Sequence, residues 1–388
     1  MRILIIFSDM IRPNRLSTFN SSLKKQTPVD HFLERLGGTA YTNCFTEGPD
    51  TPRGLASFAT GKSPYYNGCN SRLKWPRYFL KKDSKTIYDI LIKNGYKMTF
   101  FSNPNERETG IFPEHINNLN IHNKSFNLRD YLAKTKLQKK HFFFIGLPDF
   151  HWSLDDYGYT TYGEKKAYNN ILLCYDLIFD ELNINEFDHI FIFSDHGFKF
   201  NYELKSQPKH LLLNDDRTGI LLFHHQKGDN NLNKNNKLCS ITDFYPTIDF
   251  IINGECADGI PFTSEKEKEY VVVEDHIQFL PSIDLNIEQW AVITRDLIYI
   301  RNLETAYCIN RKNKSVEQKL LEKYDETLVR ETSFSSVLEE HKNVFRYNNF
   351  MHKPTSYMHG GERNKIGKFL RYLTLQKDFL NKFQDRFI

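Results

Sequence analysis

The sequence has few cysteines, and none of them lies in a metal-binding or disulfide-rich pattern. Its 388 residues include 6 cysteines, which are scattered without a CxxC pair or zinc-finger spacing. A metal knuckle or a dense disulfide framework is therefore not predicted, and we expect reduced thiols. Tryptophan is also scarce, with 3 residues, whereas phenylalanine and tyrosine number 32 and 21. With 40% hydrophobic residues, the composition is typical of a globular protein and excludes an intrinsically disordered one.

Long apolar segments and a strong net charge are also missing. No stretch approaches the roughly 18 apolar residues that a membrane-spanning helix needs. The apolar run at residues 3–7 is too short for a signal peptide, has no cleavage site and is soon followed by Asp9. We therefore expect a cytoplasmic protein without a transmembrane segment. The 52 basic and 48 acidic residues give a formal net charge of +4, which predicts no nucleic-acid partner and leaves a small anionic substrate open.

Short apolar runs alternate with helical patterns along the first two thirds of the chain. The runs typical of buried strands lie at residues 3–7, 98–101, 142–147, 190–193 and 219–223. The helical patterns lie at residues 29–36, 52–59, 86–93, 168–182 and 241–252. This alternation predicts an α/β fold with a parallel central sheet and helices on both faces. Ligands of such sheets bind beyond the carboxyl ends of the strands.

After about residue 259 the pattern changes to that of a small antiparallel sheet. Strand-like runs lie at residues 270–273, 290–294, 297–301 and 306–310. The basic segment 361–387 has apolar residues at helical spacing, which predicts a helix packed on that sheet. We therefore predict a catalytic α/β domain over residues 1–262 and a smaller α+β subdomain over residues 263–388. The Asn- and Lys-rich segment 228–237 is interpreted as a solvated loop.

The segment 51–61 places a hydroxyl group at the start of a predicted helix. Thr51 is expected to cap the helix, Pro52 suits the first helical position, and Gly61 ends the segment. The unpaired N–H groups and the helix dipole at such a position favour an attacking alkoxide and a bound anion. Thr51 is therefore a candidate nucleophile, and an ordinary helix cap is the alternative.

Two aspartates and a histidine directly follow predicted strands. Asp9 comes after the first strand, and Asp195 and His196 come after the strand that ends at residue 193. Two carboxylate oxygens and one imidazole nitrogen suit a divalent cation, and the Thr51 oxygen can complete the shell. Such an ion would lower the pKa of the Thr51 hydroxyl. The ion can be Mn, Mg, Ca or Zn, and a common strand-ending turn is the structural alternative.

These residues and the motifs around them resemble the alkaline phosphatase superfamily, and within it the sulfatase-like branch. The segments that carry the resemblance follow one another in the family's order: Asp-Met-Ile-Arg-Pro-Asn at 9–14, the helical segment 27–36, the segment 51–61, the Gly-Tyr segment 91–97, Ser-Asp-His-Gly at 194–197, the Asp-x-x-Pro-Thr motif within 241–247, and Asp-Gly at 258–259. The resemblance spans about residues 1–310. It implies the fold of that family, a metal site of Asp9, Thr51, Asp195 and His196, and Thr51 as the nucleophile.

Departures from the sulfatase pattern at the nucleophile direct the implied chemistry towards phosphorus. Sulfatases oxidise a Cys or Ser in a Cys-x-Pro-x-Arg context to formylglycine, and Thr51 cannot form that aldehyde. A threonine nucleophile resembles the phosphoryl-transferring members, such as phosphoglycerol and phosphoethanolamine transferases. Arg53, only two residues after Thr51, is expected to contact an oxygen of the transferred group, with Arg12 and Arg107 as alternatives.

A second departure concerns the number of metal ions. Met10 stands where the family has the second Asp of its opening pair, and a thioether is a poor ligand for a hard divalent ion. The resemblance then implies four ligands around one ion. A site with two ions would need more ligands, for which Asp149 and His151 are the candidates.

The remaining site residues of the family are carried over to five further positions. His151 follows the strand at 142–147, as in sulfatases, and the resemblance implies substrate contact or protonation of the leaving group, against a simple loop histidine. Asn103 and Asn105 stand at the positions of a Lys and a His that bind the anion, or they form a turn. Lys209 matches a later anion-binding Lys, with His210 beside it as a competing candidate. An exposed loop charge is the alternative for Lys209.

Together these features predict a metal-dependent phosphoester hydrolase, or a phospho- or phosphonotransferase, that acts through a covalent Thr51 intermediate. Its substrate would be a small anionic phosphoester or an activated phospho-donor. With water as acceptor the enzyme is a hydrolase, and with a sugar hydroxyl it modifies a cell-surface glycan from a soluble donor. The competing interpretations are a sulfatase-type sulfuric ester hydrolase and a catalytically degenerate binding protein.

Overall fold

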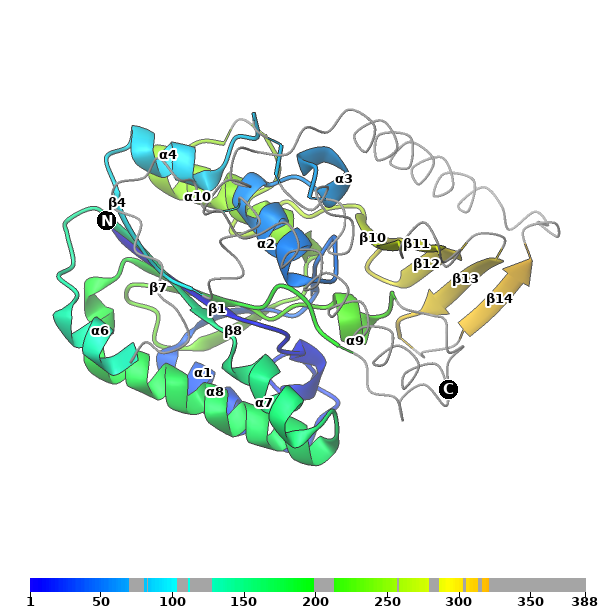
Figure 1. Ribbon diagram of the computed structural model, residues 1–388, viewed down its shortest axis with the longest axis horizontal. Coiled ribbons are helices and arrows are strands. Elements are labelled where there is room, and N and C mark those ends of the chain that lie inside the picture. The colour runs from blue at the N-terminus through cyan, green and yellow to red at the C-terminus, as the bar shows by residue number, and fades with distance from the viewer. Residues whose placement is uncertain are drawn as a thin grey trace, which may run out of the picture.

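The main part of the molecule is a sheet with helices on both of its faces (Figure 1). The computed structural model describes residues 1–69, 80–81, 83–102, 111, 128–198, 213–256, 258–278, 286–302, 305–312 and 316–320. The sheet has 7 strands in the order β4-β5-β1-β6-β7-β2-β8. Their bounds are Arg2–Ser8 for β1, Gly38–Tyr41 for β2, Lys97–Phe101 for β4, His141–Leu147 for β5, His189–Phe193 for β6, Leu222–Gln226 for β7 and Leu232–Asn235 for β8.

The central strands run parallel, as the sequence predicts. β1 pairs in parallel with both β5 and β6, and β4 pairs in parallel with β5. β7 is antiparallel to both of its neighbours, β6 and β2. The run predicted as a parallel strand at 219–223 therefore needs correction, because β7 starts later and runs in the opposite direction. An apolar run indicates burial on both faces and carries no information on strand direction.

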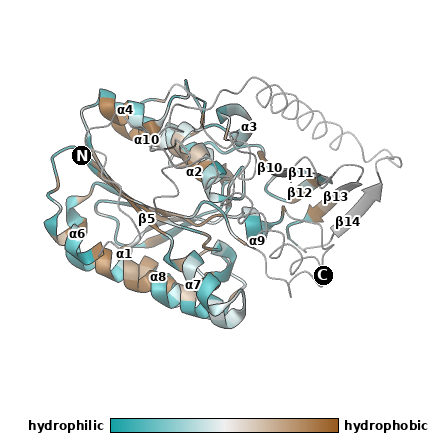
Figure 2. Cartoon of the chain, viewed as in Figure 1, coloured by the Kyte–Doolittle hydropathy of each residue, from teal (hydrophilic) through white to brown (hydrophobic). Residues whose placement is uncertain are grey.

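The two faces of the sheet are covered by different helices. One face packs on α2 (Thr51–Thr60), α4 (Ile87–Lys93) and α10 (Phe244–Asn253). The other packs on α1 (Pro28–Leu36), α6 (Leu128–Lys134), α7 (Asp149–Tyr157) and α8 (Thr161–Glu181). Along β1, Ile3 and Ile5 face the first core and Leu4 and Ile6 face the second, as the period of two in a strand requires. Figure 2 shows apolar residues along the central strands, and apolar and hydrophilic residues alternating along the helices.

Short elements connect these layers. The short helices are α3 (Pro64–Asn67), α9 (Asp215–Thr218), and the 3-10 turns at Pro13–Arg15, Ile184–Glu186 and Ile241–Asp243. A small parallel pair joins β3 (Cys44–Phe45) to β9 (Cys239–Ser240). The predicted solvated loop at 228–237 is wrong in part, because β8 lies within it and pairs in parallel with β2. β8 is polar because it lies at the edge of the sheet, where side chains meet solvent.

A second sheet follows, and it is antiparallel as predicted. Its 5 strands, β10 to β14, are paired in sequence order. They span Val271–Gln278, Asn286–Ile293, Leu297–Asn302, Thr305–Asn310 and Val316–Leu320. Its core includes Phe45 and Leu238 of the first part, so the two sheets share apolar contacts. The division at residues 262 and 263 stays a prediction, and the predicted helix at 361–387 lies outside the described residues.

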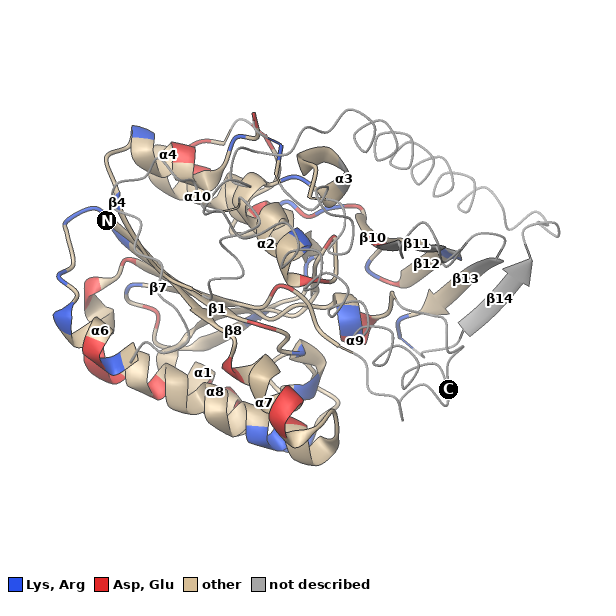
Figure 3. Ribbon diagram, in the orientation of Figure 1, with Lys and Arg blue, Asp and Glu red and all other residues tan. Residues whose placement is uncertain are grey.

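The surface carries both signs of charge. Figure 3 shows acidic and basic residues mixed along α6, α8 and α9. Within the described part of the chain, no helix is both long and apolar enough to cross a membrane.

Candidate active site

Polar side chains converge at the carboxyl ends of three neighbouring strands, β5, β1 and β6. Asp9 follows β1, and its backbone N–H donates to the carbonyl of Leu147 at the end of β5 over 3.1 Å. Asp195 lies two residues beyond β6, and His151 lies in the first turn of α7, which follows β5. The parallel pairing of these strands places their ends, and the residues after them, at one edge of the sheet.

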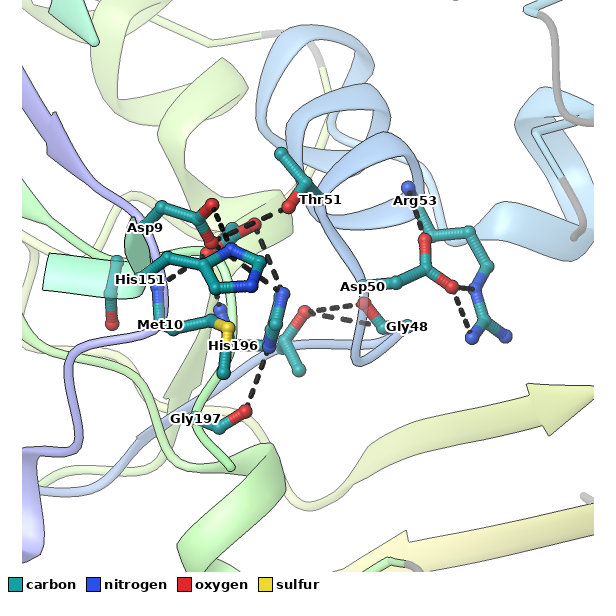
Figure 4. A network of polar contacts seen from close by, with 12 residues as sticks. Asp9, Met10, Gly48, Asp50, Thr51, Arg53, His151, His196 and Gly197 are labelled. Carbon is teal, nitrogen blue, oxygen red and sulfur yellow. Dashed lines mark hydrogen bonds and ion pairs between the residues drawn. The ribbon is translucent and has the colours of Figure 1, made fainter. Parts of the chain in front are cut away.

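The start of α2 brings Thr51 to the same edge. The N-cap of α2 is Asp50, whose Oδ1 accepts a hydrogen bond from the Arg53 backbone N–H over 3.1 Å. The expectation that Thr51 is the cap is therefore corrected by one position, because an aspartate is an equally good acceptor for the helix start. Thr51 is the first helical residue, and its hydroxyl donates to Asp9 Oδ1 over 3.4 Å (Figure 4).

Asp9, Asp195 and His196 form a cluster of metal-ligating atoms. One ligand atom from each residue lies within 4.8 Å of the others. Asp195 is fully buried, and its Oδ2 has no hydrogen-bond partner in the described part of the structure. A buried carboxylate oxygen without a donor is costly unless a cation neutralises it. The donor set of two carboxylates and one imidazole therefore fits a divalent ion.

The electrostatics of the cluster point to the same conclusion. Burial raises the pKa of Asp195 to about 6, and the neighbouring Asp9 carboxylate adds to the rise while His196 opposes it. His196 Nε2 lies 3.4 Å from Asp195 Oδ2 and 3.8 Å from Asp9 Oδ1. Its Nδ1 lies 2.7 Å from the carbonyl oxygen of Gly197, which can only accept. Nδ1 therefore carries a proton, and Nε2 is the ring nitrogen that faces the two carboxylates.

His151 is close to this cluster. Its Nδ1 lies 2.9 Å from Asp9 Oδ2, and its Nε2 lies 3.6 Å from Asp155 Oδ2. Asp149, the other residue considered for a second ion, is hydrogen-bonded to the Cys174 thiol, and burial raises its pKa. In the described ranges, the group of three or more donors consists of Asp9, Asp195 and His196.

Several solved structures have a fold similar to that of this chain. Similar structures include a 2-O GAG sulfatase (13% identity, 93% of this chain and 98% of that chain covered, TM-score 0.61). An alkaline phosphatase superfamily protein from Vibrio parahaemolyticus is also similar (16% identity, coverage 91% and 88%, TM-score 0.59). So is a phosphonate monoester hydrolase of Agrobacterium radiobacter (12% identity, coverage 91% and 96%, TM-score 0.55). The fold is that of the sulfatase-like alkaline phosphatase superfamily. No family model and no curated protein sequence matches the chain.

Within this superfamily fold, Arg53 does not point at the cluster. Its guanidinium lies on the far side of Asp50 from Thr51 (Figure 4). Nε donates to Asp50 Oδ2 over 2.6 Å, and Nη2 donates to Asp275 Oδ1 over 2.9 Å. We therefore revise the expectation that Arg53 contacts the transferred group, because both of its carboxylate partners hold it away from Thr51.

Of the two alternatives to Arg53, Arg12 binds other partners and Arg107 lies outside the described residues. Arg12 is buried in an ion pair with Glu164 at 2.7 Å, and its Nη1 donates to the carbonyl of Phe198. The positions outside the described residues are Asn103, Asn105, Arg107, Lys209 and His210. Their predicted roles in anion binding stay predictions.

Sequence reasoning missed Gly54 and the backbone conformation of Met10 at the site. A Cβ added to Gly54 would lie 2.9 Å from Asp195 Cβ, so this glycine allows α2 to pack directly on the metal cluster. The available signal was a glycine inside a helix, which costs stability unless close packing requires it. Met10 has a φ of 68°, in the left-handed region, and its N–H donates to Asp195 Oδ1 over 3.3 Å. No feature of the sequence indicated that conformation.

Proposed function

We propose that the protein is a metal-dependent hydrolase or transferase of phosphoesters, with Thr51 as the nucleophile. The observation that carries the proposal is the position of the Thr51 hydroxyl, at the start of α2 and in hydrogen-bond contact with Asp9 of the donor cluster. A helix N-terminus stabilises negative charge on an attacking oxygen and on a bound anion. The superfamily fold supports hydrolysis of a phosphoric or sulfuric ester as the broader reaction class.

The ion would be held by Asp9, Asp195 and His196, with the Thr51 oxygen as a further ligand. The orphaned Asp195 Oδ2 is the feature that best supports an ion there. When bound, a divalent ion lowers the pKa of the hydroxyl and neutralises charge on the ester oxygens. The carboxylate-rich donor set suits Mn, Mg or Ca, and the imidazole also admits Zn.

The side chains of the site supply the rest of the reaction. The Thr51 oxygen attacks phosphorus in line, the bond from phosphorus to the leaving oxygen breaks, and a phosphothreonine-type intermediate remains. His151 lies 2.9 Å from Asp9 and is partly exposed, so it can contact substrate and pass a proton to the leaving oxygen. Asp9 and Asp155 lie on either side of its ring, 2.9 Å from Nδ1 and 3.6 Å from Nε2.

A second acceptor releases the group from Thr51. With water the product is free phosphate or a phosphomonoester, and with a sugar hydroxyl the product is a modified glycan. We propose a small anionic phosphoester or an activated phospho-donor as substrate, in the cytoplasm. The names of the structural neighbours, which include a GAG sulfatase and a phosphonate monoester hydrolase, support an anionic ester as the substrate class.

Mass spectrometry of the protein, quenched with acid during turnover and then digested to peptides, tests the proposal. The wild type, incubated with Mn²⁺ and aryl phosphate mono- and diesters, should gain the mass of the transferred group on the peptide that contains Thr51. Thr51→Ala should gain none and lose turnover. Thr60→Ala is the matched control, because Thr60 ends the same helix and its hydroxyl donates to the Ala56 carbonyl. It should label as the wild type does.

The alternatives give different results in the same assay. Unchanged turnover in Thr51→Ala would remove the nucleophile from the proposal. Faster cleavage of aryl sulfates than of aryl phosphates would favour a sulfatase. A wild-type protein that neither binds a divalent ion nor turns over any ester would be a degenerate binding member.

A further inference from the structure

Asp275 belongs to the second sheet, but its side chain contacts two arginines of the α/β part. It lies in β10 and is 1% exposed. Its Oδ1 accepts from Arg53 Nη2 over 2.9 Å, and its Oδ2 forms an ion pair with Arg217. One buried carboxylate thus joins two cations that lie in different helices, α2 and α9.

The first arginine connects Asp275 to the start of α2. Arg53 also pairs with Asp50, the N-cap residue, so its guanidinium is shared between the cap and β10. The backbone of β10 adds a further contact, because Arg53 Nη1 donates to the carbonyl of Glu274 over 3.1 Å. The contacts of Arg53 with β10 therefore hold the first turn of α2, which carries Thr51, against the second sheet.

The second arginine connects Asp275 to the loop that carries His196. Arg217 lies in α9, and its backbone carbonyl accepts from the N–H of Gly197 over 2.9 Å. A Cβ on Gly197 would lie 2.1 Å from the Asp216 carbonyl oxygen, so this loop packs tightly against α9. The Gly197 carbonyl in turn accepts from His196 Nδ1, the contact that orients the imidazole. A displacement of α9 would therefore be passed on to His196.

The charge balance explains why a carboxylate is needed at this position. Burial alone would raise the pKa of Asp275, but Arg217 and Arg53 lower it below its ordinary value. Two guanidinium groups facing one site repel each other unless an anion lies between them. An asparagine at this position keeps one acceptor oxygen but presents N–H donors to the second arginine.

We propose that Asp275 is a positioning residue that holds Thr51 and His196 in place at the metal site, acting through Arg53 and Arg217. This inference rests on the proposed function. Residues that orient metal ligands from outside the coordination shell typically change metal affinity or activity about 10- to 100-fold when they are replaced. The second sheet thereby contributes to the site through Asp275, Arg53 and Arg217.

The test is Mn²⁺ binding by isothermal titration calorimetry, with full-length wild type, Asp275→Asn and Asp296→Asn. Asp296→Asn is the matched control, because it makes the same change in the second sheet, at an exposed residue paired with Lys312. We expect Asp275→Asn to bind Mn²⁺ about 10- to 100-fold more weakly than the other two proteins. Its turnover should recover when the Mn²⁺ concentration is raised, which a loss of folded protein would not do.

Each outcome decides between the inference and the function on which it rests. If wild type binds Mn²⁺ and Asp275→Asn binds it equally well, with only a lower melting temperature, Asp275 is structural and the inference is refuted. If wild type binds no divalent ion, the proposed function itself fails. If Asp275→Asn does not fold, Arg217→Met replaces it in the test, because this variant removes the ion pair between Arg217 and Asp275 and keeps the one between Arg53 and Asp275. Unchanged Mn²⁺ affinity in Arg217→Met would then refute the inference.

Discussion

Asp50 combines two interactions at the start of α2, and substitution can separate them. Its Oδ1 accepts from the backbone N–H of Arg53, and its Oδ2 lies 2.5 Å from Arg53 Nη2. The Arg53 side chain is 2% exposed and that of Asp50 is 12% exposed, so solvent screens the pair little. Asparagine keeps the cap and removes the charge, whereas alanine removes both.

The expected loss of unfolding free energy in each Asp50 variant depends on the partners that Arg53 keeps. Leaving a buried charge without any partner costs about 3–5 kcal/mol, but Asp275 still pairs with Arg53, so we expect roughly 2–3 kcal/mol for Asp50→Asn. Loss of an N-cap adds about 1 kcal/mol, so Asp50→Ala should lose roughly 3–4 kcal/mol of the free energy of unfolding.

Urea unfolding followed by far-UV circular dichroism measures these differences. Thr160→Ala is the control for the cap alone, because the Thr160 side chain accepts from the Gly163 N–H at the start of α8 and is uncharged, so it forms no ion pair. It should lose only about 1 kcal/mol. If Asp50→Asn has the same free energy of unfolding as the wild type, the ion pair does not stabilise the protein. If Asp50→Asn and Asp50→Ala lose the same free energy of unfolding, the N-cap of Asp50 does not contribute to stability.

Two further predictions concern packing at the site and acid stability. Gly54→Ala should weaken Mn²⁺ binding, because its methyl group would meet Asp195 Cβ at 2.9 Å; calorimetry with unchanged affinity would contradict this. Burial lowers the pKa of His224 to about 3 in the folded protein, whereas the ordinary pKa of a histidine is near 6.5. Below about pH 6.5 the unfolded chain therefore binds a proton at His224 that the folded protein does not bind. Stability should therefore fall with acid, by up to about 1.4 kcal/mol per pH unit from this group. His224→Gln should show a shallower loss in urea unfolding between pH 6 and 4, and an unchanged slope would count against the assignment.

Much of the site could be predicted because its residues directly follow buried strands. β1 and β6 are continuous apolar runs, and the first polar residues after them include Asp9 and Asp195. Parallel packing then brings those residues together whatever the rest of the chain does. The helix that starts at Thr51 was predicted for a similar reason, since Pro52 and Gly61 mark its two ends.

Features that depend on tertiary partners could not be predicted in the same way. β2 and β8 are short and lie at one side of the sheet, and β8 has no apolar run to identify it. The role of Asp275 depends on a contact with Arg53 across 222 positions of the sequence, for which a single sequence carries no signal. The left-handed backbone of Met10 likewise reflects its surroundings at the cluster.

The position of Arg53, by contrast, follows from helix geometry. Each residue of an α-helix is rotated by about 100° from the one before, so a side chain two positions after Thr51 points about 200° away from it. The arginine of a Cys-x-Pro-x-Arg motif lies four positions after the nucleophile, at about 400°, and so returns to within about 40° of the same face. Arg53 therefore cannot take the place of that arginine without unwinding the first turn of α2. The change of spacing converts an arginine beside the nucleophile into one that ties the helix to Asp275.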